Sequence, residues 1–554
     1  MLPALAALPQ LQAQAPAAGP QTPPPATTPP RVTKEMVVLS LAGMGLEFPD
    51  AQIDMMLPAV NRQFNQFEAL RQLDIPLDTP PAVSFSPVFE GFKVPTGRSS
   101  FRRGKAPALL RFTKPDELAY LPATQLGALI AARRITSAAL TRMYLDRLKT
   151  YGPKLNCVIT LTDDLALDQA KEADLSLRRG RRHSPLHGVP YGAKDLFDTK
   201  GILTTWGALP YRNRVPDSDA TVIEKLRAAG AVLVAKLSMG SLAQGGLWFG
   251  GMTKTPWNYE QSSSGSSAGS ASATAAGLVG FAIGTETLGS IISPSTRCGV
   301  AGVRPTFGRV SRHGAMALSW SMDKIGPICR SIADCAEVLK IIAGPDGKDL
   351  SVIEAPLRWD ARRSVKTMKV GYLADEFAGK NEEIRPVYEA ALNDLRKAGV
   401  KLEPLTLPEY PVQAIDIVLD AEAAAAFDDL TRDHGIDSLT GQQPSDWPNQ
   451  FRTSRLIPAV EYLRAQRART VFMHKFHDAV KDWDGFVAPT SSISVTATNL
   501  AGHPQVVVPC GFVDGLPQGL LFTSRLFEEG AAMRLAYAYE QATDWHSRHP
   551  ELQT

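Results

Sequence analysis

The sequence predicts an α/β protein with a mostly parallel or mixed central β-sheet that is covered by helices on both faces. From residue 115 onward, short strands rich in β-branched residues alternate with amphipathic helices, which is the pattern of stacked sheet and helix layers. With 554 residues, the chain is long enough for a large core or two domains. Its 44% hydrophobic and 21% charged residues are typical of a globular protein.

Residues 1–32 are expected to lie outside the folded part. Met1 to Ala15 is apolar and ends in Ala13-Gln14-Ala15, like a secretory signal with its cleavage site, but it lacks the basic residues that begin such signals. Export to the periplasm or the medium and a cytoplasmic location therefore both stay open. Pro16 to Pro30, rich in Pro, Thr, Ala and Gln, predicts a linker.

Residues 33–114 are expected to form a helical accessory segment packed on the catalytic domain. Thr33 to Ala42 and Asp50 to Leu73 predict helices, and Pro58 could kink or split the second one. Ala82 to Lys114 predicts irregular chain that wraps the domain. The alternative is a dimerisation arm, so a homodimer stays open.

Residues 115–554 are expected to form the catalytic domain. Apolar spacing and capping residues predict its main elements in chain order. The predicted helices cover residues 123–134, 136–151, 163–178, 218–229 and 383–398. The predicted strands cover residues 156–161, 231–235, 278–284, 369–372 and 484–489.

Three short segments carry residues suited to cleaving an amide. Lys194 follows an apolar approach, Pro190-Tyr-Gly-Ala, which is expected to be tightly turned; Ser266 lies in a Ser/Gly loop that leads into a helix; and Ser290 follows Gly289 after a strand. Amide cleavage needs a nucleophile, a base and donors for the oxyanion. No histidine lies near Ser290 in the sequence, but a buried lysine is a suitable base because burial lowers its pKa. A surface lysine paired with Asp195 is the alternative for Lys194.

Together, these segments resemble the amidase signature family of serine hydrolases over about Leu121 to Thr543. The resemblance implies the family's mixed sheet and a Ser–cisSer–Lys triad, in which Lys194 is the base, Ser266 relays the proton and Ser290 is the nucleophile. It also implies an oxyanion hole made by N–H groups of Thr287, Leu288, Gly289 and Ser290. The segments Cys298 to Ser311 and Asp323 to Pro327 match the family's scaffold around the site.

The chain departs from the family's commonest pattern where charged substrate anchors are usual. Ile292 stands in place of an arginine, and Leu288 stands in place of a glycine. With Met239, Trp248 and Phe249, Ile292 is expected to form an apolar substrate pocket. We therefore expect an amidase that cleaves amides of apolar or aromatic groups through an acyl-enzyme, and esters or carbamates present the same carbonyl.

Three other interpretations compete with this one. Gly265-Ser-Ser-Ala-Gly269 fits the G-x-S-x-G nucleophile elbow with Ser267 as its serine, but no buried strand precedes it. The chain could instead be the catalytic A subunit of a tRNA-dependent amidotransferase, which shares the triad. In a different class, it could be a catalytically dead binding module.

Composition and charge argue against several classes of binding partner. The net charge is only +3, with no long basic run, so nucleic-acid binding is not expected. No apolar run is long enough for a membrane span, and the five cysteines show no zinc-ligand spacing. We expect a small-molecule amide substrate, no cofactor and no metal.

Overall fold

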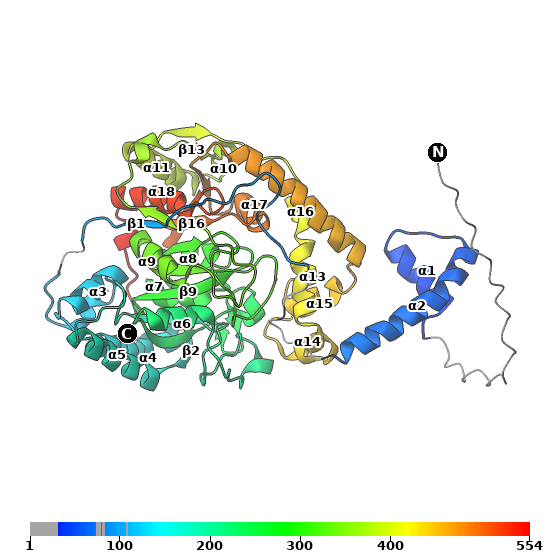
Figure 1. Cartoon of the computed structure of the whole chain (residues 1–554), viewed down its shortest axis with the longest axis horizontal. Coiled ribbons are helices and arrows are strands. Elements are labelled where there is room, and N and C mark those ends of the chain that lie inside the picture. Colours follow the sequence, from blue (N-terminus) through cyan, green and yellow to red (C-terminus); the bar gives the residue numbers. More distant parts are fainter. Residues whose placement is uncertain (1–30, 74–78, 80–82, 107–108, 554) are drawn as a thin grey trace, which may run out of the picture. The chain divides into compact units, whose positions relative to one another are not determined.

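The computed structural model describes residues 31–73, 79, 83–106 and 109–553 (Figure 1). The chain divides into two compact units, Met1–Pro76 and Leu77–Thr554. The signal-like segment and the Pro-rich linker lie outside the described residues.

The described residues of the first unit form two helices, α1 (Lys34–Gly43) and α2 (Asp50–Arg71). The side chain of Thr33 caps α1 by accepting a hydrogen bond from the N–H of Met36 at 3.4 Å. Pro58 lies inside α2, which nevertheless runs as one helix. Buried Val37 and Leu41 of α1 pack together with other apolar residues of this unit in a small core.

The second unit is built on an 11-stranded mixed sheet, in the order β14-β13-β15-β17-β16-β10-β11-β9-β3-β4-β2. β3 pairs in parallel with β4 and β9, whereas β11 pairs antiparallel with β9 and β10. The strands of the sheet are β2 (Val158–Leu161), β3 (Pro190–Lys194), β4 (Val232–Leu237), β9 (Phe281–Glu286), β10 (Ala301–Arg304), β11 (Lys324–Cys329), β13 (Val370–Tyr372), β14 (Leu402–Pro404), β15 (Gly485–Pro489), β16 (Gln505–Val513) and β17 (Leu516–Thr523).

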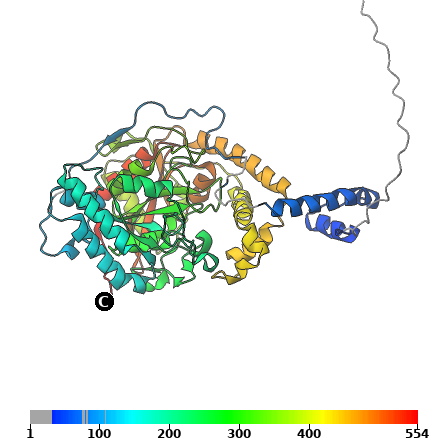
Figure 2. The same cartoon turned by 60° about the horizontal axis from the view of Figure 1, so that its bottom comes forward.

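Helices cover both faces of this sheet, as predicted (Figures 1 and 2). α9 and α18 pack on each other, and α7 and α8 form a second packed pair. The helices are α3 (Ala123–Ala131), α4 (Ser137–Leu155), α5 (Asp163–Arg178), α6 (Thr221–Ala228), α7 (Ala268–Ala275), α8 (Ile292–Cys298), α9 (Ile332–Ile342), α10 (Ala374–Ala378), α11 (Arg385–Lys397), α12 (Val412–Ile415), α13 (Ile417–Ala426), α14 (Asp428–Arg432), α15 (Trp447–Ser454), α16 (Ala459–Val480), α17 (Ser494–Ala501) and α18 (Glu529–Ala542).

Three small two-stranded sheets complete the unit. Two of them, β5 (Leu247–Trp248) with β6 (Gly251–Met252) and β7 (Lys254–Thr255) with β8 (Asn258–Ser262), precede the Ser266 loop. In the third, β1 (Ser100–Arg102) pairs in parallel with β12 (Arg358–Asp360). This pairing anchors residues that the sequence assigned to the accessory segment. The division between compact units accordingly falls at Pro76 and Leu77, not at residue 114.

The segment before Lys194 differs from the expectation, because residues 190–194 form the buried strand β3 and not a tight turn. Pro190 is its first residue, a position at which a strand tolerates proline. Gly192 allows close packing, since a Cβ there would lie 2.2 Å from Leu237 Cδ1. Lys194 is therefore held by a strand that pairs on both sides, with β4 and β9.

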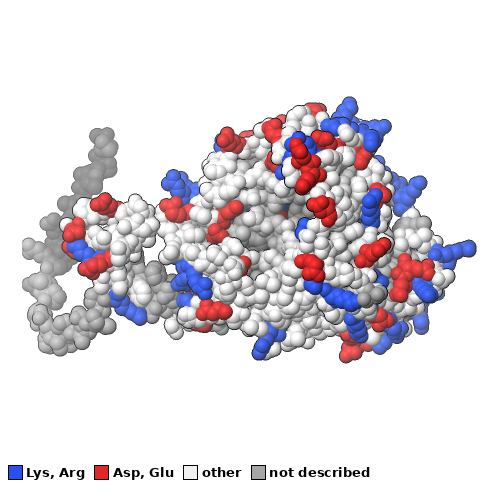
Figure 3. Space-filling view, turned by 180° about the vertical axis from the view of Figure 1, so that it is seen from behind, with Lys and Arg blue, Asp and Glu red and all other residues white. Residues whose placement is uncertain are grey.

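Charges of both signs lie on the surface, and the five cysteines lie in the interior. Figure 3 shows acidic and basic side chains interspersed over the face that it draws. All five cysteines are buried and unpaired by disulfides. No helix in the described part of the chain is long and apolar enough to cross a membrane.

Candidate active site

Lys194 lies at the end of β3 with its side chain fully buried. Its Nζ donates hydrogen bonds to Ser266 Oγ and to Thr285 Oγ1, each at 2.8 Å. Burial lowers the pKa of Lys194 from 10.5 to about 7, and the negative charges of Asp323 and Glu286 oppose part of this effect. A large fraction of the amine is therefore neutral near neutral pH and can accept a proton.

The alternative of a surface ion pair between Lys194 and Asp195 is wrong. Asp195 is buried and pairs with Lys236 of the neighbouring strand at 3.2 Å. Its Oδ2 also accepts hydrogen bonds from the backbone N–H and the hydroxyl of Thr205. The carboxylate of Asp195 therefore pairs with Lys236 and not with Lys194. The Lys194 amine instead donates to Ser266 and Thr285.

Ser266 lies in the loop between β8 and α7, with its side chain directed to Lys194. The peptide bond between Gly265 and Ser266 is cis. Only glycine fits before Ser266, because a Cβ on Gly265 would lie 1.8 Å from the carbonyl oxygen of Gly245. The next serine, Ser267, donates to the carbonyl of Thr285 at 3.0 Å and accepts from its N–H at 3.2 Å. Ser267 therefore holds the Ser266 loop on β9 and is not the nucleophile of an elbow.

Ser290 lies in the half-exposed turn between β9 and α8. Gly289 before it has φ +87°, which favours glycine and bends the chain sharply. In the described part of the chain, no protein group accepts from the N–H groups of Leu288, Gly289 and Ser290. Ser290 is joined to the Ser266 loop through its carbonyl, which accepts from the N–H of Ser267 at 3.2 Å. The turn thus presents free N–H donors beside the serine hydroxyl.

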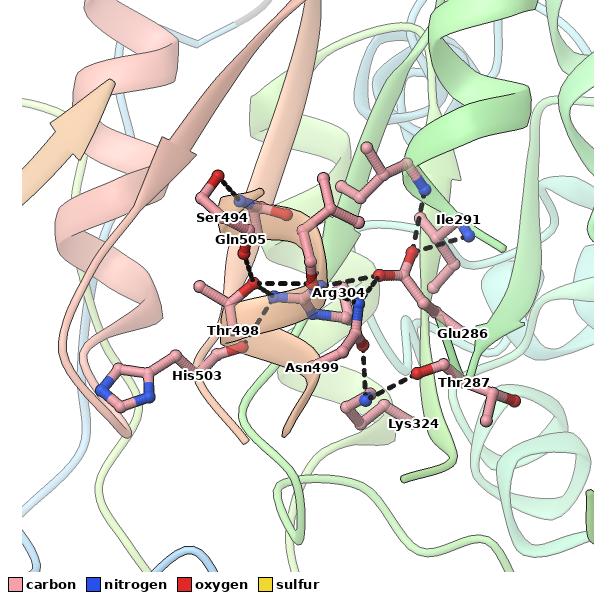
Figure 4. A network of polar contacts seen from close by, with 12 residues as sticks. Glu286, Thr287, Ile291, Arg304, Lys324, Ser494, Thr498, Asn499, His503 and Gln505 are labelled. Atoms are coloured by element: carbon pink, nitrogen blue, oxygen red, sulfur yellow. Dashed lines mark hydrogen bonds and ion pairs between the residues drawn. The ribbon is translucent and has the colours of Figure 1, made fainter. Parts of the chain in front are cut away.

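A buried network of polar side chains binds the backbone of this turn before and after Ser290 (Figure 4). Glu286 Oε2 accepts the N–H groups of Ile291 and Ile292 at 2.8 and 3.0 Å. Its Oε1 accepts from Arg304 Nη1 at 2.7 Å and from Asn499 Nδ2 at 2.9 Å. Burial raises the pKa of Glu286, but Arg304 and the helix N–H groups outweigh this effect and lower the pKa from 4.5 to about 2, so the carboxylate stays ionised. Glu286 fixes the residues that follow Ser290 and leaves the preceding N–H groups free.

A second arm of the network supports the start of the turn. Lys324 Nζ donates to the carbonyl of Thr287 at 3.3 Å and to Asn499 Oδ1 at 2.6 Å. The hydroxyl of Thr287 donates to Asp323 Oδ1 at 2.6 Å. Asp323 and Lys324, which the sequence indicated only as scaffold, therefore position the turn that carries Ser290.

A cavity of about 950 Å³ lies next to this site, although Lys194, Ser266 and Ser290 themselves do not line it. Thr285, Thr287 and Asp323 line the part of the cavity next to the serine loops. Much of the remaining wall is apolar and comes from residues far apart in sequence: Val83, Phe85, Val88, Phe89, Leu196, Ala315, Met316, Leu318, Trp320, Ile325, Leu463 and Met473. A volume of this size accommodates a drug-sized molecule.

The four substrate-binding residues predicted from the sequence do not line this cavity. Met239 and Ile292 are buried among apolar core residues. Trp248 packs against Phe249, and its Nε1 donates to the carbonyl of Asn156 at 3.3 Å. Phe249 remains partly exposed whereas the other three are buried, and their role in substrate binding stays a prediction. The apolar wall that the structure shows comes from other segments, which no local motif marks.

A buried carboxylate of the cavity wall, Glu422, is paired within the protein. Its Oε2 accepts from Ser319 Oγ at 2.6 Å and from the N–H of Ser321 at 3.0 Å. Its Oε1 accepts from the hydroxyl of Tyr462 at 3.0 Å and from Gln466 Nε2 at 3.3 Å. Both oxygens of this carboxylate, which a substrate cation would use, therefore already have partners.

The two arginines of the cavity wall also have hydrogen-bond or ion-pair partners within the protein. Arg469 donates to the carbonyl of Leu500 at 2.7 Å, and to the hydroxyl and carbonyl of Ser321 at 2.8 and 3.0 Å. Arg312 pairs with Asp349 at 3.1 Å. The wall therefore combines apolar side chains with buried charges that already have partners, and exposed Glu90 also lines it. Within the described residues, no cluster of three or more His, Cys, Asp or Glu side chains is arranged to hold a metal ion.

The fold and this pair of serine loops around a buried lysine define a serine-dependent enzyme that acts on amide C–N bonds. The family model described as Amidase matches residues 139–496, and the chain belongs to this amidase family. Curated relatives include the A subunits of the glutamyl-tRNA(Gln) amidotransferases of Moorella thermoacetica and Pseudomonas syringae. The first is 34% identical over 79% of this chain and 99% of its own length, and the second is 34% identical over 76% and 97%.

Solved structures show the same relationship. The peptide amidase of Stenotrophomonas maltophilia has a TM-score of 0.70 and 33% identity, covering 79% of this chain and all of its own. The A subunit of the glutamyl-tRNA(Gln) amidotransferase of Thermotoga maritima has a TM-score of 0.67 and 25% identity, covering 79% of this chain and 99% of its own. About a fifth of this chain therefore has no counterpart in either structure.

Proposed function

We propose that this protein hydrolyses amides of uncharged apolar or aromatic acyl groups, with Lys194 as base, Ser266 as proton relay and Ser290 as nucleophile. The observation that carries the proposal is the buried Lys194 amine, 2.8 Å from Ser266 Oγ, with its pKa lowered to about 7. A lysine in this state can remove a proton at neutral pH, as general-base catalysis requires.

The proposed reaction has two halves. Neutral Lys194 takes the hydroxyl proton of Ser266, Ser266 takes the proton of Ser290, and Ser290 Oγ attacks the amide carbonyl. The N–H groups of residues 287–290 stabilise the oxyanion. The C–N bond then breaks, the amine leaves with the proton returned through Ser266, and water cleaves the acyl-enzyme ester by the same route.

The paired charges of the cavity support the preference for uncharged substrates. Free glutamine carries an ammonium and a carboxylate, which would each need an unpaired partner in a partly buried site. Glu422 and Arg469, the buried charges of the wall, already have hydrogen-bond partners within the protein. An aliphatic or aromatic acyl group needs no such partner.

The test is kcat/KM of the purified chain for acetamide, hexanamide, benzamide and glutamine. We expect kcat/KM to rise from acetamide to hexanamide and benzamide by tenfold or more, since each well-placed apolar group changes discrimination by about 1 to 3 kcal/mol. Glutamine as the best of the four substrates would overturn the proposal. Phenyl esters of the same acyl groups, together with phenyl carbamates, extend the panel to the other carbonyl substrates.

The curated relatives favour a second candidate, the A subunit of an amidotransferase that acts on glutamyl-tRNA. This function predicts partner subunits and a glutaminase activity that depends on them. Affinity purification from the native host distinguishes the two, since a stoichiometric complex with other subunits supports the second candidate. Labelling of Ser290 by an alkyl fluorophosphonate excludes a catalytically dead binding module. Light scattering on the purified chain tests the homodimer, which we retain as a proposal.

A further inference from the structure

One wall of the cavity comes from residues 83–90, which we call the strap. Val83, Phe85, Val88 and Phe89 of the strap line the cavity. The strap lies in the second compact unit but precedes residue 139, where the match to the amidase family begins. This chain therefore builds part of its substrate cavity from a segment outside the family's matched region.

Aromatic contacts hold the strap in place at two points. The ring of Phe85 packs edge-on against Phe307 at 5.0 Å between centroids. Phe89 packs against His474 and His477 of α16 at 4.5 and 5.3 Å. The strap is thus fixed to the helix that forms the neighbouring wall.

Phe85 also covers a buried cation. The guanidinium carbon of Arg469 lies 3.7 Å from the centroid of the Phe85 ring. Arg469 is only 1% exposed, yet it lines the cavity, so its charge lies close to the substrate space. Its N–H groups donate to Ser321 and Leu500 in the plane of the guanidinium, and the ring of Phe85 covers one flat face.

We propose that Phe85 is a specificity-determining residue, which makes the distal cavity apolar by contributing its ring and by covering Arg469. The proposal rests on the proposed function and deepens it. With Phe85 in place, the cavity favours uncharged acyl groups long enough to reach the strap. Without the ring, the same space exposes one face of the Arg469 cation, so an acyl group that ends in a carboxylate is disfavoured less.

The experiment compares Phe85→Ala with Phe85→Leu, which keeps an apolar cover, and with the matched control Phe92→Ala. Phe92 packs on His477 at 5.6 Å, as Phe89 does, but it does not line the cavity. The substrates are acetamide, hexanamide and the monoamide of adipic acid, which has the same chain length as hexanamide and a terminal carboxylate. Two readouts are used: kcat/KM of the active protein, and dissociation constants measured by calorimetry in a Ser290→Ala background, which need no turnover.

In Phe85→Ala, we expect the preference for hexanamide over acetamide to fall by about tenfold or more, and the preference for adipic monoamide over hexanamide to rise. Phe85→Leu should retain most of the hexanamide preference, and Phe92→Ala should resemble the parent protein. Equal losses for all three ligands in Phe85→Ala, or the same change in Phe92→Ala, would overturn the proposal. If the active protein cleaves none of the amides while the calorimetric preferences change as expected, the proposed function fails and the role of Phe85 stands.

Discussion

The lowered pKa of Lys194 has a consequence for activity that can be measured directly. With a pKa of about 7, the neutral fraction of this amine rises from roughly a tenth at pH 6 to roughly nine tenths at pH 8. We therefore expect kcat/KM for hexanamide to rise about tenfold across this interval and to level off above pH 8, because the pH dependence of kcat/KM reports the free enzyme. A profile that is flat from pH 6 to 9, with chemistry rate-limiting, would refute Lys194 as the titrating base.

The same residue predicts an effect on stability, with a defined sign. Between pH 7 and 10.5 the unfolded chain holds a proton on Lys194 that the folded protein lacks, so this residue makes the free energy of unfolding rise with pH in that window. The slope is at most about 1.4 kcal/mol per pH unit, which sums to a penalty on the order of 4 to 5 kcal/mol at pH 7. Lys194→Met removes this penalty together with two hydrogen bonds.

Urea unfolding of the parent protein and of Lys194→Met at pH 7, 8 and 9 measures this effect, because the other titrating groups are common to both proteins. We expect the methionine variant to be inactive yet at least as stable at pH 7, with an advantage that shrinks as the pH rises. Two unfolding series that run parallel over this range would mean that the lysine keeps an ordinary pKa when folded.

Three further predictions concern Ser290, Thr285 and Glu286. Ser290→Ala should lower kcat by far more than a hundredfold while circular dichroism and the Tm stay close to those of the parent, and a smaller loss would rule out Ser290 as the nucleophile. Thr285→Val removes an acceptor of the Lys194 ammonium, which should lower the pKa of Lys194 and move the rise of kcat/KM to lower pH, whereas an unmoved profile would contradict this coupling. Glu286→Gln replaces a carboxylate that holds the Ser290 turn, and a misplaced turn should cost about a hundredfold in kcat with little change in KM; a change confined to KM would argue against a positioning role.

The sequence predicts the chemistry of the site better than the shape of its pocket. Lys194, Ser266 and Ser290 are recognisable because their short segments, taken together, resemble the motifs of the amidase signature family. The structure brings Lys194 and Ser266 into hydrogen-bonding contact and joins the Ser290 turn to the Ser266 loop. Phe85 and Arg469, by contrast, meet across the fold, and neither carries a local pattern that reports the other.

Secondary structure is likewise predicted where local apolar spacing determines it, and missed where contacts with neighbouring strands determine it. Helices with clear apolar spacing, such as α5 (Asp163–Arg178), are predicted with their bounds. Strand β3 (Pro190–Lys194) is missed because proline and glycine are unfavourable in an isolated strand, and only the neighbours β4 and β9 make that conformation stable. Met239 and Ile292 lie in buried apolar clusters, and apolar character alone does not separate a core residue from a ligand contact, so their role in a pocket stays a prediction.

The network behind Ser290 links parts of the chain that leave the ribosome at different times. Arg304 and Glu286 depend on Thr498, Asn499 and the carbonyl of His503, which are made about 200 residues later. Since chains are synthesised from the N-terminus, the nascent polypeptide carries all three proposed catalytic side chains long before their support exists. Hydrolytic activity should therefore begin only when the last segments have joined the sheet. A protein shortened before Thr498 would retain every residue of the triad and still lack the means to hold Ser290 in place.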